Sequence, residues 1–151
     1  MIRVSTQGRY ALRAVVDVLV NSEDGPTLRR DIADRQGLSA AYVAQLFRQL
    51  TRAGILTSVR GRGGGYTIGG DPSSITAGDV LRAVEGPIAV VHCVEPGESP
   101  SCDRAENCVT HRVWRGLSNA MTQYLDSLTL ESLRDQAVEL AEADPEPANA
   151  G

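Results

Sequence analysis

The sequence predicts a mainly α fold with a small β wing, and three features of the 151-residue chain lead to this prediction. Helical apolar spacing recurs in three short stretches before residue 54. A glycine-rich hairpin pattern follows at residues 55–68. A long, nearly heptad-like apolar pattern then runs from residue 113 to residue 128. This order predicts a helical unit with a hairpin, followed by a long helix.

The first two helices are predicted from apolar spacing and from residues that cap helix ends. Ser5 or Thr6 can cap a helix that continues to the turn at residues 21–26. Thr27 is expected to cap a second, short helix, which Gly37 ends. The apolar face of the first helix consists of Tyr10, Ala11, Ala14, Val15, Val18 and Leu19.

A third helix is expected over residues 40–53, with Ser39 as its cap. Its buried stripe is Val43, Leu46, Phe47 and Leu50. The opposite face has no acidic residue and carries Tyr42, Gln45 and Arg48 among several alanines. Gln and Arg make bidentate contacts with base edges, and small residues let a helix settle into a major groove. An ordinary solvated helix face is the alternative interpretation.

The hairpin favours DNA binding over that alternative. Residues 55–59 and 66–68 are typical of two strands, joined by a flexible tip at residues 60–65. Three helices followed by such a wing is the order of a winged helix-turn-helix. Arg60 and Arg62 can enter a minor groove or pair with phosphates. The predicted DNA contacts are Ser39, Tyr42, Gln45, Arg48, Arg60 and Arg62.

Charge is distributed unevenly along the chain. Residues 1–70 carry ten arginines and five acidic residues, a net charge of +5, whereas residues 71–151 carry five arginines and fourteen acidic residues, a net charge of -9. A basic half is expected of a nucleic-acid-binding module, so the overall charge of -4 does not exclude binding to double-stranded DNA. The sequence shows neither a signal peptide nor a membrane-spanning apolar run, so we expect a cytoplasmic protein without a membrane partner.

All three cysteines and both histidines lie between residues 92 and 111. If Cys108 begins the long helix, His111 lies one turn along the same face, so both side chains can reach one metal centre. Together with Cys93 and Cys102 they form a donor set suited to a zinc ion or to an iron–sulfur cluster. Zinc sites usually contain a tight Cys-x2-4-Cys pair, which this sequence lacks, so the spacing favours the larger cluster. His92 is a weaker candidate, because in an extended segment its side chain would point away from that of Cys93.

The long helix has the apolar positions Val113, Leu117, Ala120, Met121, Tyr124, Leu125 and Leu128. This stripe can cover the chain's own core, which is the alternative to a special role. Only three other substantial helices are available to cover it, however, so we expect a homodimer through residues 111–128.

Five motifs of the sequence match a known family. They are Thr6-Gln-Gly-Arg-Tyr-Ala-Leu, Asp31-Ile-Ala-Asp-Arg-Gln-Gly-Leu-Ser, Tyr42-Val-Ala-Gln-Leu-Phe, Val59-Arg-Gly-Arg-Gly-Gly-Gly-Tyr and Cys108-Val-Thr-His-x-x-Trp. With these motifs the chain resembles the IscR-like family of iron–sulfur cluster transcriptional regulators, which includes nitric-oxide-sensing and iron-responsive relatives. The resemblance covers residues 2–140 and implies a homodimeric winged-helix repressor of operator DNA. It also implies a [2Fe-2S] cluster held by Cys93, Cys102, Cys108 and His111.

Two departures from the family pattern leave the cluster type and the fourth ligand open. The loop between Cys93 and Cys102 has eight residues, more than the five found in IscR-type members. The nitric-oxide-sensing relatives can use an acidic residue near the N-terminus as a ligand, and no acid precedes Asp17 here. A [4Fe-4S] cluster is therefore the alternative to [2Fe-2S].

The predicted division of the chain joins these parts. It comprises a winged helix-turn-helix DNA-binding domain at 1–70, a linker helix and short apolar run at 71–91, a cysteine-rich cluster-binding loop at 92–111, a dimerisation helix and C-terminal helix at 108–142, and a disordered tail at 143–151. Two other functions remain open: a metal-free regulator that senses oxidants through its thiols, and a small iron–sulfur redox protein. An enzyme is not expected, because no catalytic triad, carboxylate pair or nucleotide-binding loop can be assembled.

Overall fold

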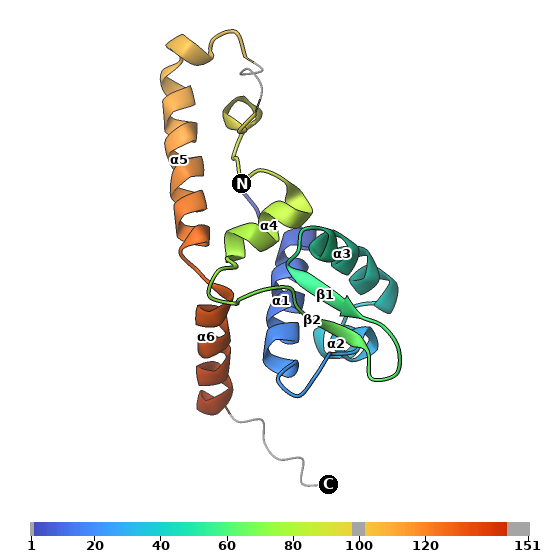
Figure 1. Ribbon diagram of the computed structural model, residues 1–151. Helices are drawn as coiled ribbons and strands as arrows, with labels where there is room; N and C mark the ends of the chain where they lie inside the picture. The colour runs from blue at the N-terminus through green and yellow to red at the C-terminus, as the bar shows by residue number, and fades with distance from the viewer. Residues whose placement is uncertain (1, 98–101, 145–151) are drawn as a thin grey trace.

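The computed structural model describes residues 2–97 and 102–144. The elements are α1 (Thr6–Asn21), α2 (Arg29–Gln36), α3 (Ala40–Arg52), β1 (Leu56–Val59), β2 (Gly65–Ile68), α4 (Ala77–Glu85), the short 3-10 helices η1 (His92–Val94) and η2 (Ala105–Asn107), α5 (Val109–Asp126) and α6 (Leu130–Ala143). Helices α1 to α4 and the hairpin gather in one body, while α5 projects from it and α6 follows alongside α1 (Figure 1). The mainly α fold with a small wing is confirmed.

Local sequence signals set most helix ends. The Ser5 hydroxyl accepts a hydrogen bond from the Gly8 amide at the start of α1, and Ser39 accepts one from the Tyr42 amide at the start of α3. Gly37 ends α2 in the left-handed conformation, with φ of 64°. These caps satisfy backbone groups that have no partner within the helix, so the predictions made from them hold.

Thr27 is an exception, because it does not cap α2. The N-cap position is Leu28, which makes no capping hydrogen bond through its side chain. Thr27 instead donates from its hydroxyl to the Asn21 carbonyl oxygen and pairs through its backbone with Tyr66, with two N···O distances of 2.9 Å. Pairing with a distant strand residue has overridden the local capping preference, and it attaches the base of the wing to the start of α2.

The core of the body lies between α1, α3 and the hairpin. The buried stripe predicted for α3 is fully buried, and the Phe47 ring meets the Tyr66 ring edge to face with centroids 4.7 Å apart. Strands β1 and β2 pair antiparallel from Leu56 opposite Ile68 to Val59 opposite Gly65. The hairpin therefore rests on the core at its base, while its tip extends beyond it.

Helix α4 connects the body to α5. A capping box starts it: the Thr76 hydroxyl accepts from the Asp79 amide, and the Asp79 carboxylate accepts from the Thr76 amide. The turn between α5 and α6 is tied to the start of α4 by two backbone hydrogen bonds, from the Ala77 amide to the Leu128 carbonyl oxygen and from the Leu130 amide to the Ile75 carbonyl oxygen, both 2.8 Å long. The root of α5 is thus held against the body.

The C-terminal region differs slightly from its prediction. Helix α5 ends at Asp126 rather than near Leu128, and α6 includes Ala143, which was expected in the disordered tail. The rest of that tail from residue 145 lies outside the described residues. Within residues 2–97 and 102–144, no helix is long and apolar enough to cross a membrane.

Candidate functional site

The outward face of α3 presents a polar and basic surface. Because the opposite stripe of α3 is buried in the core, Ser39, Gln45 and Arg48 lie exposed on the outside. Tyr42 is half-buried, and its ring packs edge-on against the Tyr10 ring of α1 at a centroid distance of 6.1 Å. The core thereby sets the direction of this face, and the Tyr10 contact restricts the Tyr42 ring.

The wing carries the other two predicted DNA contacts. Arg60 and Arg62 are exposed in the tip between β1 and β2, and neither takes part in an ion pair with any residue that the structure describes. Gly65 begins β2 with φ of 144°, and a Cβ added there would overlap the Thr27 carbonyl oxygen. A glycine is thus required where the wing returns to the body.

The three cysteines lie on different local structures. Cys93 is in η1, Cys102 precedes η2, and Cys108 is the N-cap residue of α5; all three are half-buried free thiols. The extended conformation expected at residues 92 and 93 is wrong, because these residues form a 3-10 helix. The His92 side chain is 84% exposed, and its Nδ1 lies 2.8 Å from the Glu95 carboxylate, so the contact it makes is with a carboxylate on the surface.

His111 is buried, with only 4% of its surface exposed. Its Nε2 atom lies 2.6 Å from the Arg115 guanidinium, one helical turn further along α5. Its Nδ1 atom is buried and has no hydrogen-bond partner among the described residues. Buried polar atoms are nearly always paired, so this nitrogen is a candidate ligand atom.

The pKa of the Cys108 thiol is lowered by its surroundings. A hydrogen bond from the Thr110 hydroxyl, with an S···O distance of 3.1 Å, lowers the pKa of the Cys108 thiol below its ordinary value. The His111 amide and the charge of Arg104 act in the same direction. The thiolate is the form that ligates metals and attacks oxidants, so this thiol is prepared for either reaction.

The candidate ligands do not converge on one point. Cys108 and His111 share the first turn of α5, but the described residues contain no group of three or more Cys, His, Asp or Glu side chains able to hold a metal ion. The donor chemistry still fits an iron–sulfur cluster, since three free thiols accompany a buried imidazole with an unpaired nitrogen. In the structure, the side chains of Cys93, Cys102, Cys108 and His111 do not form one group.

Two contacts on α5 escaped the sequence analysis. The Ser118 hydroxyl, in a side chain only 5% exposed, accepts from the Val90 amide and attaches the segment before the cysteines to α5. Arg115 contacts His111, and the four-residue spacing of these side chains on one helix was the signal that could have found the pair.

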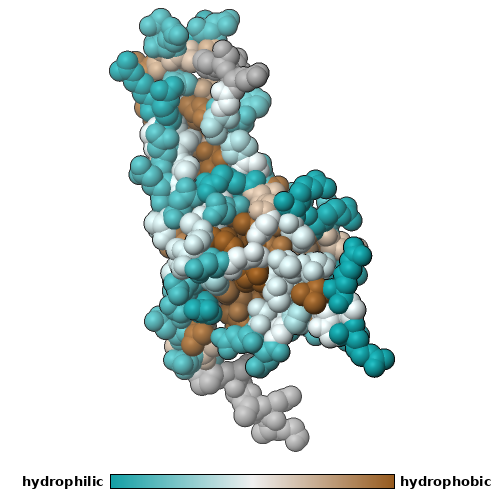
Figure 2. All heavy atoms as spheres, in the orientation of Figure 1, coloured by the Kyte–Doolittle hydropathy of each residue, from teal (hydrophilic) through white to brown (hydrophobic). Residues whose placement is uncertain are grey.

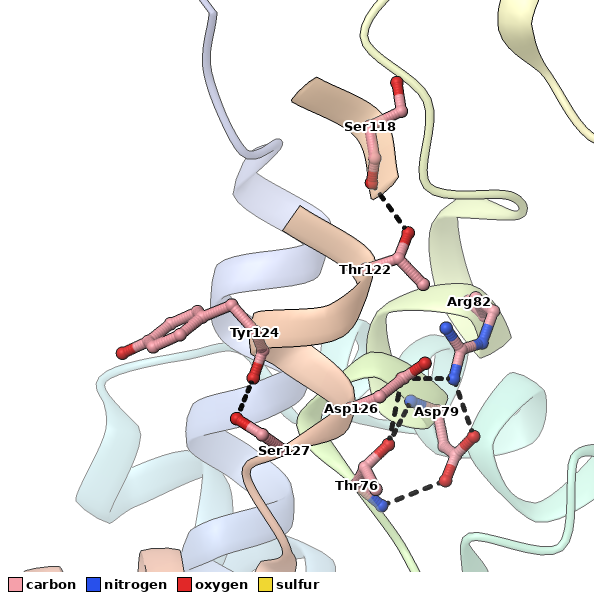
Figure 3. A network of polar contacts seen from close by, with 8 residues as sticks. All are labelled: Thr76, Asp79, Arg82, Ser118, Thr122, Tyr124, Asp126 and Ser127. Atoms are coloured by element: carbon pink, nitrogen blue, oxygen red, sulfur yellow. Dashed lines mark hydrogen bonds and ion pairs between the residues drawn. The ribbon is translucent and has the colours of Figure 1, made fainter. Parts of the chain in front are cut away.

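A further polar network lies where α5 meets α4. Figure 3 shows Arg82 of α4 between two carboxylates: its Nη2 atom is 2.9 Å from Asp79 and 2.6 Å from Asp126 at the end of α5. Asp126 also accepts a longer hydrogen bond from the Thr76 hydroxyl. The network links the end of α5 to the start of α4 through side chains as well as backbone.

The apolar stripe predicted on α5 divides into two parts. Met121, Leu125 and Leu128 are half-buried, whereas a second set is exposed. That set is Val113 at 55%, Leu117 at 36%, Tyr124 at 66% and Ala120. Val109, which was not part of the predicted stripe, is also exposed, at 76%. On the face drawn in Figure 2, apolar side chains gather over α1 beside α6 and again along α5. The exposed half of the stripe is available to a partner.

Three comparisons relate the chain to known proteins. The Rrf2 family model, described as an iron-dependent transcriptional regulator, matches residues 4–136. The HTH-type transcriptional regulator IscR of Escherichia coli O1:K1 is 44% identical over 131 residues, which are 87% of this chain and 79% of that protein.

Solved structures agree with this result. CymR (YrzC), the global cysteine regulator of B. subtilis, matches with a TM-score of 0.73 and 38% identity over 90% of this chain and 98% of that chain. IscR of T. potens matches with a TM-score of 0.70 and 32% identity over 99% of this chain and 93% of that chain.

Proposed function

Because the chain belongs to the Rrf2 family of iron-dependent transcriptional regulators, we propose that it is a DNA-binding repressor controlled by an iron–sulfur cluster. Its relatives are named as regulators, not as enzymes. The observation that carries the DNA-binding part is the exposed, acid-free face of α3 next to a wing with two arginines. The function of a small redox protein does not account for that surface.

In this proposal, α3 lies in the major groove of operator DNA. Gln45 and Arg48 contact base edges, while Ser39 and Tyr42 contact the DNA backbone near the start of the helix. Arg60 and Arg62 of the wing reach a minor groove or phosphates beside it. The restricted Tyr42 ring and the buried stripe of α3 keep this surface preorganised.

A homodimer would place two such surfaces on one operator. The exposed apolar side chains of α5 support dimerisation through residues 111–128, because a helix that projects from the body cannot cover them with its own chain. A symmetric pair of α5 helices would bury both copies of the stripe.

The cluster would be held by Cys93, Cys102, Cys108 and His111. The three thiols would bind as thiolates and His111 through one ring nitrogen, which makes the imidazole the fourth ligand. When bound, a [2Fe-2S] or [4Fe-4S] cluster supplies a centre sensitive to iron supply and redox state. The lowered pKa of Cys108 favours its ligating form at neutral pH.

The cluster is tested by anaerobic purification, a visible absorption spectrum, and iron and sulfide assays. We expect a coloured protein with matching iron and sulfide, whose ratio per chain selects the two-iron or four-iron form. Cys102→Ala should lose the iron and keep the helical circular dichroism, since the core lies elsewhere. Normal iron content in that variant would remove Cys102 from the ligand set, and a colourless wild type after reconstitution would exclude the cluster.

DNA contacts are tested by the salt dependence of binding to fragments selected from genomic DNA. Arg62→Ala should weaken binding to all sequences and reduce the slope of log K against log salt by about one. Arg134→Ala, which removes a half-buried arginine of α6 far along the chain from the wing, is the matched control and should leave the slope unchanged. The same slope in wild type and Arg62→Ala would exclude a phosphate contact by the wing.

A second candidate is a metal-free thiol sensor. The lowered pKa of Cys108 favours it, and a matching solved structure is named a cysteine regulator. This function predicts a colourless protein whose DNA affinity differs after treatment with dithiothreitol and with hydrogen peroxide. The Cys108→Ser variant should show no such difference. An unchanged affinity under both conditions would exclude it.

A further inference from the structure

We propose that Arg115 is a positioning residue for His111: its guanidinium holds the imidazole in the cluster-free protein and is released when His111 becomes a ligand. The release rests on the proposed function, because it concerns the ligand role of His111. The contact between Arg115 and His111 is present in the cluster-free protein and does not depend on the proposed function. Two observations support the proposal, the 2.6 Å contact at Nε2 and the unpaired, buried Nδ1.

The contact determines which ring nitrogen carries the proton. A guanidinium has only hydrogen-bond donors, so Arg115 donates and Nε2 accepts. The proton of the neutral ring then lies on Nδ1. This N–H group is buried without an acceptor among the described residues. Burying a donor without an acceptor costs free energy, so burial alone would disfavour a proton on Nδ1. Arg115 therefore stabilises a tautomer of His111 that its surroundings do not favour.

Ligation through either nitrogen ends this contact. Ligation at Nε2 would use the lone pair that accepts from Arg115. Ligation at Nδ1 would leave the ring proton on Nε2, where that N–H group would face the donors of Arg115. The guanidinium would be displaced in both cases, so Arg115 and the cluster would compete for His111.

Among the residues that the structure describes, Arg115 contacts His111 and takes part in no ion pair. No acidic residue occurs within one turn on either side of it on α5, from residue 111 to residue 119. The Arg115 side chain is exposed, so after release it can extend into solvent. Arg115 is thus held in place by His111 in the cluster-free protein and would be free in the cluster-bound protein.

The positioning is tested on the cluster-free protein by long-range ¹H–¹⁵N NMR of the histidine ring. The wild type should show His111 with its proton on Nδ1, and Arg115→Ala should shift the population toward the Nε2–H form. Arg115→Lys keeps a donor at this position and should restore part of the wild-type signature. Arg112→Ala removes a neighbouring exposed arginine of α5 and should change nothing. The same His111 tautomer in wild type and Arg115→Ala would overturn the proposal.

The competition is tested by reconstitution with ferrous iron and sulfide, followed by the rate of iron loss to a chelator. Wild type should lose iron about two- to tenfold faster than Arg115→Ala, the range expected when one hydrogen bond recaptures the dissociated ligand. Arg112→Ala should behave as wild type, and a His111→Ala background should abolish the difference.

The outcomes separate this proposal from the proposed function. If wild type takes up no iron, the cluster and the release on ligation both fail, while the NMR result still decides whether Arg115 positions His111. If wild type takes up iron and Arg115→Ala loses it at the wild-type rate, the competition is overturned and the cluster stands.

Discussion

At the scale of single residues, the buried carboxylate of Asp17 has specific partners. Asp17 of α1 is buried, accepts two hydrogen bonds from Arg35 Nε and one from its Nη2, and accepts another from Gln36 at 2.8 Å. This carboxylate joins α1 to α2, which packs against α3. A sequence shows such an acid only as an interruption in an apolar face, without the partners that make it stabilising.

Asp17→Ala should lower the free energy of unfolding by about 2 to 3 kcal/mol. This loss is at or below the lower end of the range of about 3 to 5 kcal/mol for breaking a buried pair, because the Arg35 side chain is 39% exposed and can return to water. Urea denaturation measures the change. Asp135→Ala, which removes an exposed carboxylate 3.8 Å from Arg134, should cost less than about 0.5 kcal/mol. Equal losses in the two variants would contradict this account.

The Thr110 hydroxyl controls the reactivity of Cys108. Thr110→Val removes the hydrogen bond that lowers the pKa of the thiol, so that pKa should rise and less thiolate should be present at neutral pH. Alkylation of Cys108 in the cluster-free protein should therefore slow at pH 7, and the rates should converge above the pKa of both proteins.

The pH profile of iodoacetamide labelling, read by mass spectrometry, measures this effect. Thr122→Val is the matched control, because the Thr122 hydroxyl donates to the Ser118 carbonyl oxygen and contacts no cysteine. A Thr110→Val profile that overlays that of wild type would show that another group sets the acidity of Cys108.

At the scale of elements, the wing and α5 depend on contacts made at their roots. The hairpin is attached through Thr27 and Tyr66, and α5 through the bonds around α4 and the Arg82 network. The free ends of both elements carry the proposed functional groups. Stability at the root and exposure at the end is the arrangement expected of elements that bind another molecule.

Gly65→Ala should weaken the attachment of the wing. The new Cβ meets the Thr27 carbonyl oxygen, and a φ of 144° is strained for alanine, so a loss of about 2 to 3 kcal/mol is expected in urea denaturation. Gly70→Ala is the control, because its nearest neighbour is the flexible end of Ile75 at 3.7 Å and its φ is not positive. Two equally stable variants would show that the wing tolerates a side chain at residue 65.

At the scale of the whole molecule, charge and apolar surface are separated. The net +5 of residues 1–70 lies in the body with α3 and the wing, while the net -9 of residues 71–151 includes α5 and α6. Helix α5 projects from the body (Figure 1). It carries the exposed apolar side chains Val113, Leu117 and Tyr124. The molecule thus offers a basic surface suited to phosphates and a separate apolar surface suited to a second copy.

Leu117→Glu should convert the proposed dimer into a monomer. The substitution removes about 2 kcal/mol of apolar burial from each chain, which raises the dimer dissociation constant by about a thousandfold. Sedimentation equilibrium measures it. Leu117 is 36% exposed in the single chain, so the monomer should remain folded by circular dichroism. Gln123→Glu adds the same charge to an exposed polar position of α5, and a dimer in both variants would place the interface elsewhere.

Much of the fold follows from the sequence because its signals are local. The periodic apolar stripe of α3, the caps at Ser5 and Ser39, and the glycine-rich hairpin each act over a few residues, so they could be identified without knowledge of the tertiary structure. The outward direction of the α3 surface was predicted for the same reason, since burying one face of a helix exposes the other.

The tertiary structure alone decided the contacts between distant residues. Thr27 became a strand partner of Tyr66 instead of a cap, and the α5 stripe divided because only part of it faces the body. The sequence by itself determined the mainly helical order, the wing and the set of cysteine and histidine donors. Only the tertiary structure decided that His111 is buried against Arg115 with one nitrogen unpaired, because burial and hydrogen-bond partners depend on how the elements pack.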